Sequence, residues 1–230
     1  MKHAEAVVCA ATLFSRLDET AYTSITDDAF WNEILTVCRS EAYRNDYESA
    51  TEKHTMATTS ADRDQHYAQL TKPPSYCEYR QFANRILTPG IPGHVAPIES
   101  LYVPWTEMPG SEIGNDTGRY LSDRALHIMA LCDQLAIEIP PTLRDTPDHL
   151  TLLCELWAFL DEHAPACDAR AFAHDHGAWL PAYRAALGSR FDNIPDEALK
   201  KTLGFYQDLI DLVMQMMQPH NEKGEQREAL

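Results

Sequence analysis

Between residues 195 and 217 the apolar residues recur every three or four positions, and this period most limits what the chain can fold into. Such spacing puts apolar side chains on one face of an α-helix. Pro195, Asp196 and Glu197 suit the first turn of that helix. About three heptads would also suit a coiled-coil seam, but a core helix of a bundle is the better interpretation. The residues on this face are Leu199, Leu203, Tyr206, Ile210, Val213 and Met217.

The same helical period recurs along the rest of the chain, whereas the alternation typical of strands is scarce. Apolar residues share one helical face within residues 7–17, 30–38, 121–135 and 150–160. Asp27 or Asp28 suits the N-cap of the second of these helices. We therefore predict an all-α fold, a single-domain helical bundle over residues 1–218. The polar residues 219–230 are expected to form a frayed tail.

One long segment, around residues 88–118, cannot continue any helix. It contains Pro89, Pro92, Pro97, Pro104 and Pro109 with glycines between them. Proline removes a backbone donor and biases the preceding residue away from helix. We predict a long irregular Pro/Gly-rich loop here. Loops of this length usually serve a function or are disordered, and the aromatic residues of this one argue against disorder.

Charge and cysteine content exclude several classes of protein. The net charge of −16 argues against binding to nucleic acid or to an anionic membrane surface and is compatible with a basic peptide partner. No apolar run approaches the ~20 residues of a membrane-spanning helix. The six cysteines form no C-x-x-C pair, so we interpret them as small buried hydrophobes in a reducing compartment. The start of the chain lacks the pattern of a signal peptide. These features together favour a cytoplasmic protein.

Sequence motifs of enzymes are absent. The chain has no phosphate-binding loop, no nucleophile elbow and no zinc-finger spacing. His174 and His176 are two positions apart, so they cannot share one helix face, and we expect a helix-edge or surface pair. We predict no catalytic residue, metal site or cofactor. Two alternatives remain, an all-helical metal-dependent hydrolase using Asp148, His149 and these two histidines, or a helical adaptor that dimerises through residues 195–217.

The stretch "TPDHLTLLCELWAFL", residues 146–160, places a proline, an acid and a histidine before an apolar run. Capping explains most of it: Thr146 or Asp145 can cap the helix, Pro147 suits its first position, and Asp148 favours its positive end. His149 would then be an early-helix residue with no structural need to be histidine. A function in recognition is the competing explanation for His149.

Three segments together resemble the TorD/DmsD/NarJ-type redox-enzyme maturation chaperones. The Pro-Asp-His-Leu element at 147–150, followed by Glu-Leu at 155–156, is similar to that family's signature. A Pro-x-Glu-Ser-x-Tyr stretch at 97–102 lies about fifty residues earlier, on the irregular loop. Trp179 and Pro181 resemble the family's Trp-x-Pro step. The similarity spans about residues 80–187.

The resemblance implies an all-helical, cytoplasmic protein of the TorD-like type that is not an enzyme. It would bind the twin-arginine signal peptide and the apo form of a molybdopterin oxidoreductase catalytic subunit. It would hold this client until cofactor insertion, and so delay export. Arg85, Ile86 and Leu87 match the segment that precedes the loop in this family, although Ala83 stands where an aromatic residue is usual. A monomer, a homodimer and a swapped dimer all remain open.

The resemblance also assigns roles to residues. Glu99 and Asp148 would supply carboxylates for guanidinium groups, and His149 would bind peptide carbonyls or orient Asp148. An apolar groove with aromatic anchors would hold the rest of the peptide. The competing interpretation is that the 97–102 segment only braces the loop against the bundle. The predicted peptide-binding residues are Arg85, Ile86, Leu87, Glu99, Ser100, Tyr102, Trp105, Pro147, Asp148 and His149.

Overall fold

The structure is a computed structural model that describes residues 1–49, 67–112, 114 and 116–217, with side chains described through residue 40 and from residue 67 onward. Within these residues the chain forms helices and no β-strand, and the one backbone pairing of strand type is an isolated bridge. The predicted all-α class is confirmed. The tail predicted at 219–230 lies outside the described residues.

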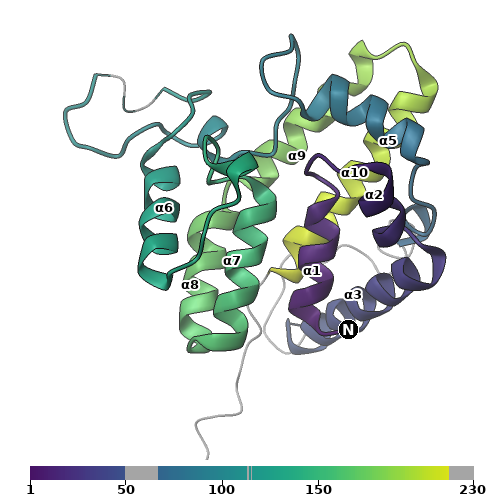
Figure 1. Ribbon diagram of the computed structural model, residues 1–230, viewed down its shortest axis with the longest axis horizontal. Coiled ribbons are helices and arrows are strands. Elements are labelled where there is room, and N and C mark those ends of the chain that lie inside the picture. Colours follow the sequence, from purple (N-terminus) through teal and green to yellow (C-terminus); the bar gives the residue numbers. More distant parts are fainter. Residues whose placement is uncertain (50–66, 113, 115, 218–230) are drawn as a thin grey trace, which may run out of the picture.

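Figure 1 shows how the described helices follow one another along the chain. The α-helices are α1 (His3–Thr12), α2 (Glu19–Ile25), α3 (Asp28–Ser49), α5 (Tyr76–Phe82), α6 (Asp123–Leu135), α7 (Leu150–His163), α8 (Ala166–Gly177), α9 (Leu180–Gly188) and α10 (Glu197–Met216). A π-helix, η1 (Ala83–Leu87), and three 3-10 turns, η2 (Glu99–Leu101), η3 (Pro141–Leu143) and η4 (Phe191–Asn193), complete the described elements.

Helix α10 lies in the core, where α1, α3, α5 and α9 pack against it (Figure 1). The six residues of its predicted apolar face are all buried. Tyr206 donates its hydroxyl to the carbonyl of Leu13 at 3.0 Å and stacks on Phe82. The prediction of a core helix is confirmed. Within the described residues this face is covered by the chain's own helices.

Local signals identify the start of α3 as expected. Asp27 caps α3, since its Oδ1 accepts from the backbone N–H groups of Ala29 and Phe30 at 3.1 and 3.3 Å. Asp196 caps α10 in the same way, so this helix begins at Glu197, and Pro195 and Asp196 precede it instead of lying in its first turn as expected. The helix predicted over 121–135 begins later, at Asp123. Leu121 lies outside it in the left-handed region at φ 56° and is 43% exposed, which corrects its assignment to the buried face.

The sequence suggested that the cysteines are buried, but not all of them are. Cys38, Cys132 and Cys154 are buried, whereas Cys77 and Cys167 are exposed. The interpretation of every cysteine as a buried hydrophobe was therefore wrong for these two. Cys77 stands in the first turn of the short helix α5, whose buried residues are Tyr79 and Phe82, so its side chain falls on the outer side.

In the described residues of the segment between η1 and α6, η2 is a 3-10 turn and the backbone around it is irregular. Backbone hydrogen bonds hold this segment against the helices at both of its ends. Val95 donates to the carbonyl of Ile86 at 2.6 Å, and Asp123 donates to the carbonyl of Trp105 at 3.0 Å. The segment therefore runs from the end of η1 to the first residue of α6 and places η2 between them.

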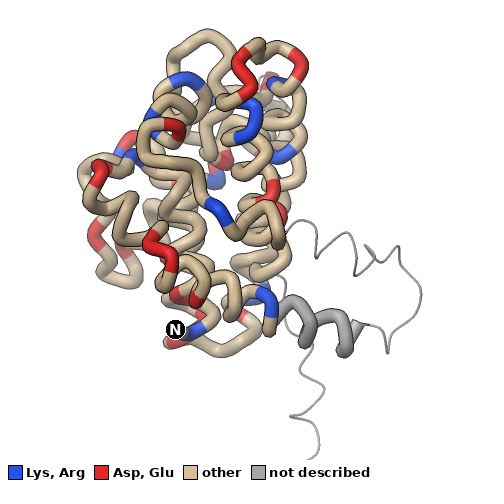
Figure 2. The backbone as a smooth tube through the Cα atoms, turned by 90° about the vertical axis from the view of Figure 1, so that its right-hand side faces the viewer, with Lys and Arg blue, Asp and Glu red and all other residues tan. Residues whose placement is uncertain are grey.

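Helix α6 lies at the outer edge of the molecule, beside α7 and α8 and far from α3 and α5 (Figure 1). On the opposite side of the molecule Lys and Arg lie interspersed with Asp and Glu (Figure 2). Among the described residues, no helix combines the length and the apolar content needed to cross a bilayer.

Candidate functional site

The two principal segments singled out in the sequence lie side by side. Ile98 and His149 form an isolated antiparallel bridge. On one side of it Glu99 donates its backbone N–H to the carbonyl of Asp148 at 3.1 Å, and on the other Leu150 donates to the carbonyl of Pro97 at 2.9 Å. These bonds fix the register of the irregular loop against the start of α7.

This bridge changes where α7 begins. Bridge pairing needs an extended backbone, and His149 has φ −70° and ψ 139°. The helix therefore starts at Leu150, and His149 is its N-cap, with Nδ1 accepting from the backbone N–H of Thr151 at 3.2 Å. The expectation that Thr146 or Asp145 caps the helix and that Pro147 is its first residue was wrong. His149 therefore has a structural role, as the N-cap of α7, which the local sequence pattern did not predict.

The carboxylate of Asp148 binds the loop through Ser100. Its Oδ2 accepts the backbone N–H of Ser100 at 2.6 Å and also the Ser100 hydroxyl. The hydroxyl oxygen of Ser100 lies 2.8 Å from that of Ser122 and accepts the Ser122 backbone N–H at 3.1 Å. All three residues are fully buried. The chain of bonds joins the starts of α7 and α6 through the 3-10 turn η2.

Glu99 points into a second chain of polar contacts, formed with two histidines. Its Oε2 lies 2.7 Å from Nδ1 of His176 on α8, and Nε2 of His176 lies 2.9 Å from Nδ1 of His127 on α6. Glu99 and His176 are buried, while His127 is exposed. The contacts thus run from a buried carboxylate to the surface.

The prediction for the histidine pair on α8 was half right. His174 and His176 do not share a face, as the spacing required, but only His174 is at the surface, where it contacts Asp175. His176 lies on the face that also buries Ala169 and Phe172, seven and four positions earlier. That apolar spacing was the signal that could have identified His176 as a buried residue.

Burial shifts the protonation equilibria at this site. Burial raises the pKa of Glu99, and the neighbouring charge of Asp148 adds to this, while the hydrogen bond from His176 opposes it. Burial also lowers the pKa of His149 to about 4, so that its ring is neutral at pH 7. The backbone N–H of Thr151 occupies Nδ1, which leaves the ring proton of His149 on Nε2.

Each of the two buried carboxylates has one oxygen that accepts no hydrogen bond from the described residues. Oε1 of Glu99 and Oδ1 of Asp148 have no hydrogen-bond partner among the described residues. Carboxylate oxygens accept two hydrogen bonds each, and charged donors are their strongest partners. The arrangement can therefore accept further donors on adjacent residues from the two motif segments.

The third resembling segment joins the same region through aromatic packing. Tyr102 stacks on Trp179 with ring centroids 5.4 Å apart and meets Tyr183 edge-on. Its hydroxyl donates to the carbonyl of Ala96 at 3.0 Å, and the Trp179 indole N–H donates to the carbonyl of His176 at 2.9 Å. All three segments thus meet at η2.

The remaining predicted residues lie apart from these contacts. Ile86 and Leu87 are 2% and 6% exposed, so they belong to the core. The Arg85 Nη1 atom lies 3.8 Å from the carboxylate of Asp196 at the start of α10. Trp105 is half-buried and donates its indole N–H to the carbonyl of Tyr120 at 3.2 Å, before α6.

Pro147 is buried beside the bridge. Sequence reasoning missed Ser122 because a serine directly before a helix is most simply explained as its N-cap. Its hydroxyl makes no capping bond to α6 and binds Ser100 instead. The part of the chain that the structure describes contains no group of three or more His, Cys, Asp or Glu side chains placed to hold a metal ion.

Comparison of the chain with protein-family models, with curated proteins and with solved structures found no match, so its function is inferred from its own residues and their arrangement.

Proposed function

We propose that this protein is a cytoplasmic, TorD-like chaperone for a molybdopterin oxidoreductase. It binds the twin-arginine signal peptide and the apo form of the catalytic subunit, assists cofactor insertion and delays export. The observation that carries the proposal is the convergence of three distant segments. The stretches 97–102, 147–150 and 176–181, which carry the sequence resemblance, meet around one 3-10 turn through backbone, carboxylate and aromatic contacts.

The chemistry of the site supports a cationic ligand. Glu99 and Asp148 are adjacent through the bridge, and each keeps one buried acceptor oxygen. A guanidinium group presents five N–H donors in a planar fork that matches carboxylate oxygens. The two arginines of a signal peptide provide two such groups. The net charge of −16 also favours encounter with a basic peptide.

Both carboxylates are fully buried, so a ligand reaches them only when the covering segment moves. We propose that Tyr120–Ser122 is the segment that moves, because Ser122 binds Ser100, which binds Asp148, while Tyr120 and Leu121 are 39% and 43% exposed. Gly118 and Leu121 both have positive φ, at 79° and 56°. Leu121 is strained in this region, so rotation of the segment relieves a cost of about 1 kcal/mol.

Calorimetric titration tests the proposal. The ligands are signal peptides of molybdenum reductases from the source organism, each beside a version with both arginines replaced by alanine. We expect micromolar or tighter binding that is lost with the arginines and weakens as salt rises. Binding that is equal for both versions, or no binding to any peptide, would contradict the proposed function.

Two variants connect the binding to the site. Asp148→Asn and Glu99→Gln keep the shape of each side chain and remove its charge, so each should weaken peptide binding at least tenfold. Asp161→Asn is the matched control, because it removes an acid from the exposed side of α7. An equal loss for all three variants would indicate only a general effect of net charge.

A further inference from the structure

Exposed large apolar side chains gather in one part of the described structure. Of the six that are exposed, five lie between residues 108 and 129 and the sixth, Ile91, lies earlier in the loop. Large apolar side chains grouped on a surface commonly mark a site of interaction. The five residues, which lie on α6 or directly before it, form what we call the α6 apolar face. They are Met108, Tyr120, Leu121, Leu126 and Met129.

Helix geometry places the last two side by side on one exposed flank of α6. Leu126 and Met129 are three positions apart, which makes them neighbours on a helix surface, and they are 53% and 39% exposed. The neighbouring side of the helix buries Ala125, Ile128 and Cys132 against the rest of the protein, so Leu126 and Met129 lie beside the buried stripe. Figure 1 shows α6 at the edge of the molecule, with α7 and α8 on its inner side.

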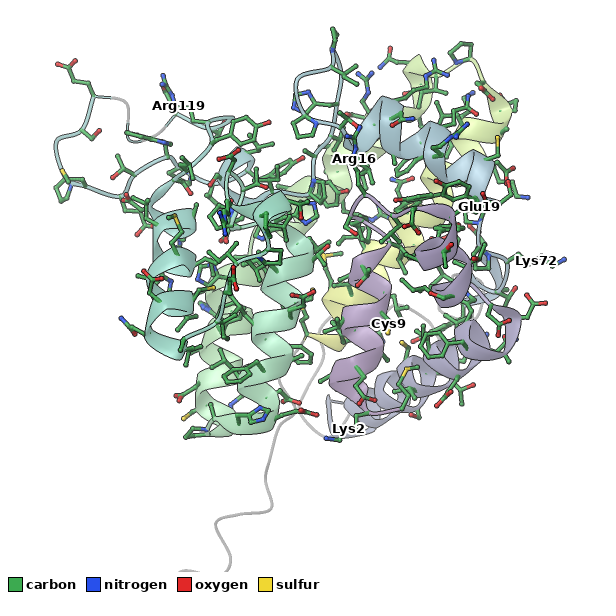
Figure 3. All side chains as sticks on the ribbon, in the orientation of Figure 1. Lys2, Cys9, Arg16, Glu19, Lys72 and Arg119 are labelled. Carbon is green, nitrogen blue, oxygen red and sulfur yellow. The ribbon has the colours of Figure 1, made fainter. Side chains whose placement is uncertain are left out.

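The other three residues are held near the start of this helix. Tyr120 and Leu121 directly precede Ser122 and the first helical residue, Asp123. Met108 is tethered there because Asp123 accepts from the Thr106 hydroxyl at 2.6 Å and from the Glu107 backbone N–H at 3.1 Å. Figure 3 labels Arg119 on the same stretch of loop, above α6.

Acidic groups surround this face. Residues 105–135 contain five acids and two arginines. Arg119 is paired with Asp116, and Arg124 with Glu107, both at 2.9 Å. Hydrogen bonds lower the pKa of Asp123, so this carboxylate is ionised at neutral pH. The α6 apolar face is therefore an exposed apolar surface with acidic side chains around it.

The face also adjoins the buried carboxylates. Ser122, between Leu121 and the helix, binds Ser100, which binds Asp148. A ligand could therefore place its positive charges against the acidic groups at the start of α6. The apolar part that follows would then lie along Leu126 and Met129 of the helix. This is the order of a signal peptide, in which arginines precede the apolar stretch.

We infer that the α6 apolar face is the docking surface for the apolar stretch of a basic, amphipathic client peptide whose arginines lie toward the start of α6. This inference rests on the proposed function and adds the surface that holds the second half of the ligand. A second copy of the chain fits less well, because two such faces would bring carboxylates against carboxylates.

Fluorescence anisotropy of the full chain with a synthetic labelled peptide tests the inference. The peptide carries two adjacent arginines followed by about 12 leucine and alanine residues. A second peptide keeps the arginines and has serine throughout the apolar stretch. The double variant Leu126→Ser/Met129→Ser should bind the first peptide at least tenfold more weakly than the wild type and bind the second equally well.

Two further variants sharpen the result. Ile91→Ser is the matched control, since it removes a side chain of similar exposure elsewhere and should leave binding unchanged. Leu126→Arg places a positive charge on the face and should weaken binding of the arginine peptide further. Circular dichroism checks that each variant keeps its helix content, as expected for exposed positions.

The possible failures are distinct. If the wild type binds the first peptide and the double variant binds it equally well, the surface is wrong and the proposed function stands. If the wild type binds no peptide, the proposed function fails and the docking surface fails with it. If sedimentation shows a wild-type dimer that the double variant abolishes, the face is a contact between copies and the inference is overturned.

Discussion

Asp148 accepts hydrogen bonds from both the backbone N–H and the hydroxyl of Ser100, a residue 48 positions earlier in the chain. Both residues are fully buried. The carboxylate therefore accepts a backbone hydrogen bond from the loop, as a backbone carbonyl does in a helix or a strand. It satisfies a buried donor that the irregular segment cannot satisfy by itself.

Replacing Asp148 should therefore affect stability as well as binding. Asp148→Ala leaves the Ser100 N–H buried without an acceptor and should lower the free energy of unfolding by about 2–3 kcal/mol. Asp148→Asn retains one acceptor oxygen and should cost about 1 kcal/mol. Urea denaturation at pH 7 measures both. A loss below about 0.5 kcal/mol in each variant would exclude a bracing role.

His149 should make stability depend on pH. Its pKa is about 4 in the folded protein, against 6.5 when exposed, so the unfolded chain binds protons more readily between these values. Stability is then fully present above pH 6.5 and falls as pH is lowered toward 4, by on the order of 3 kcal/mol.

The control for this pH dependence is His149→Asn, since asparagine can still cap α7 but does not titrate. Other groups contribute equally to both proteins, so the difference between the two curves isolates His149. Thermal or urea unfolding from pH 7.5 down to 4 gives these curves. Parallel curves would show that the ring of His149 is protonated equally in both states.

The two histidines of α8 should differ sharply in importance. His176→Ala removes the hydrogen-bond partner of buried Glu99 and should destabilise the fold by about 2–4 kcal/mol. His174→Ala, two residues earlier, removes a side chain that is 88% exposed and should change stability by less than about 0.5 kcal/mol. Equal effects in urea denaturation would contradict the placement of His176.

The end of α6 offers a stabilising substitution. Ala136 follows the helix in the left-handed region, at φ 54°, where glycine is favoured. Ala136→Gly should stabilise the protein by about 1 kcal/mol, while Ala130→Gly, in the exposed interior of the same helix, should destabilise it by a similar amount. Differential scanning calorimetry of the two variants should show shifts in Tm of opposite sign.

The all-α class could be predicted because it depends on local periodicity. The apolar spacing of residues 199–217 and the capping acid Asp27 are signals within one helix, and the structure confirms them. These signals need no knowledge of what the helix packs against. They therefore survive in a single sequence.

The start of α7 could not be predicted in this way. Local capping rules gave Pro147 to the helix, but the bridge to Ile98 keeps His149 extended and delays the helix to Leu150. Nothing near residue 149 in the sequence indicates a partner at residue 98. The burial of Glu99 and Asp148 depends on the same long-range contact, so their place in the core was equally hidden.

The bridge between Ile98 and His149 also determines when the loop can fold during synthesis of the chain. A ribosome adds about 5–20 residues per second, so the loop emerges several seconds before the residues that hold it. Until residue 150 is made, Ser100 lacks its acceptor and the loop has no fixed register. Closing such a span carries an entropic cost that local helix formation does not. The site that gathers the three segments is thus among the last parts of the nascent chain to take shape, after α1, α2 and α5 have been synthesised.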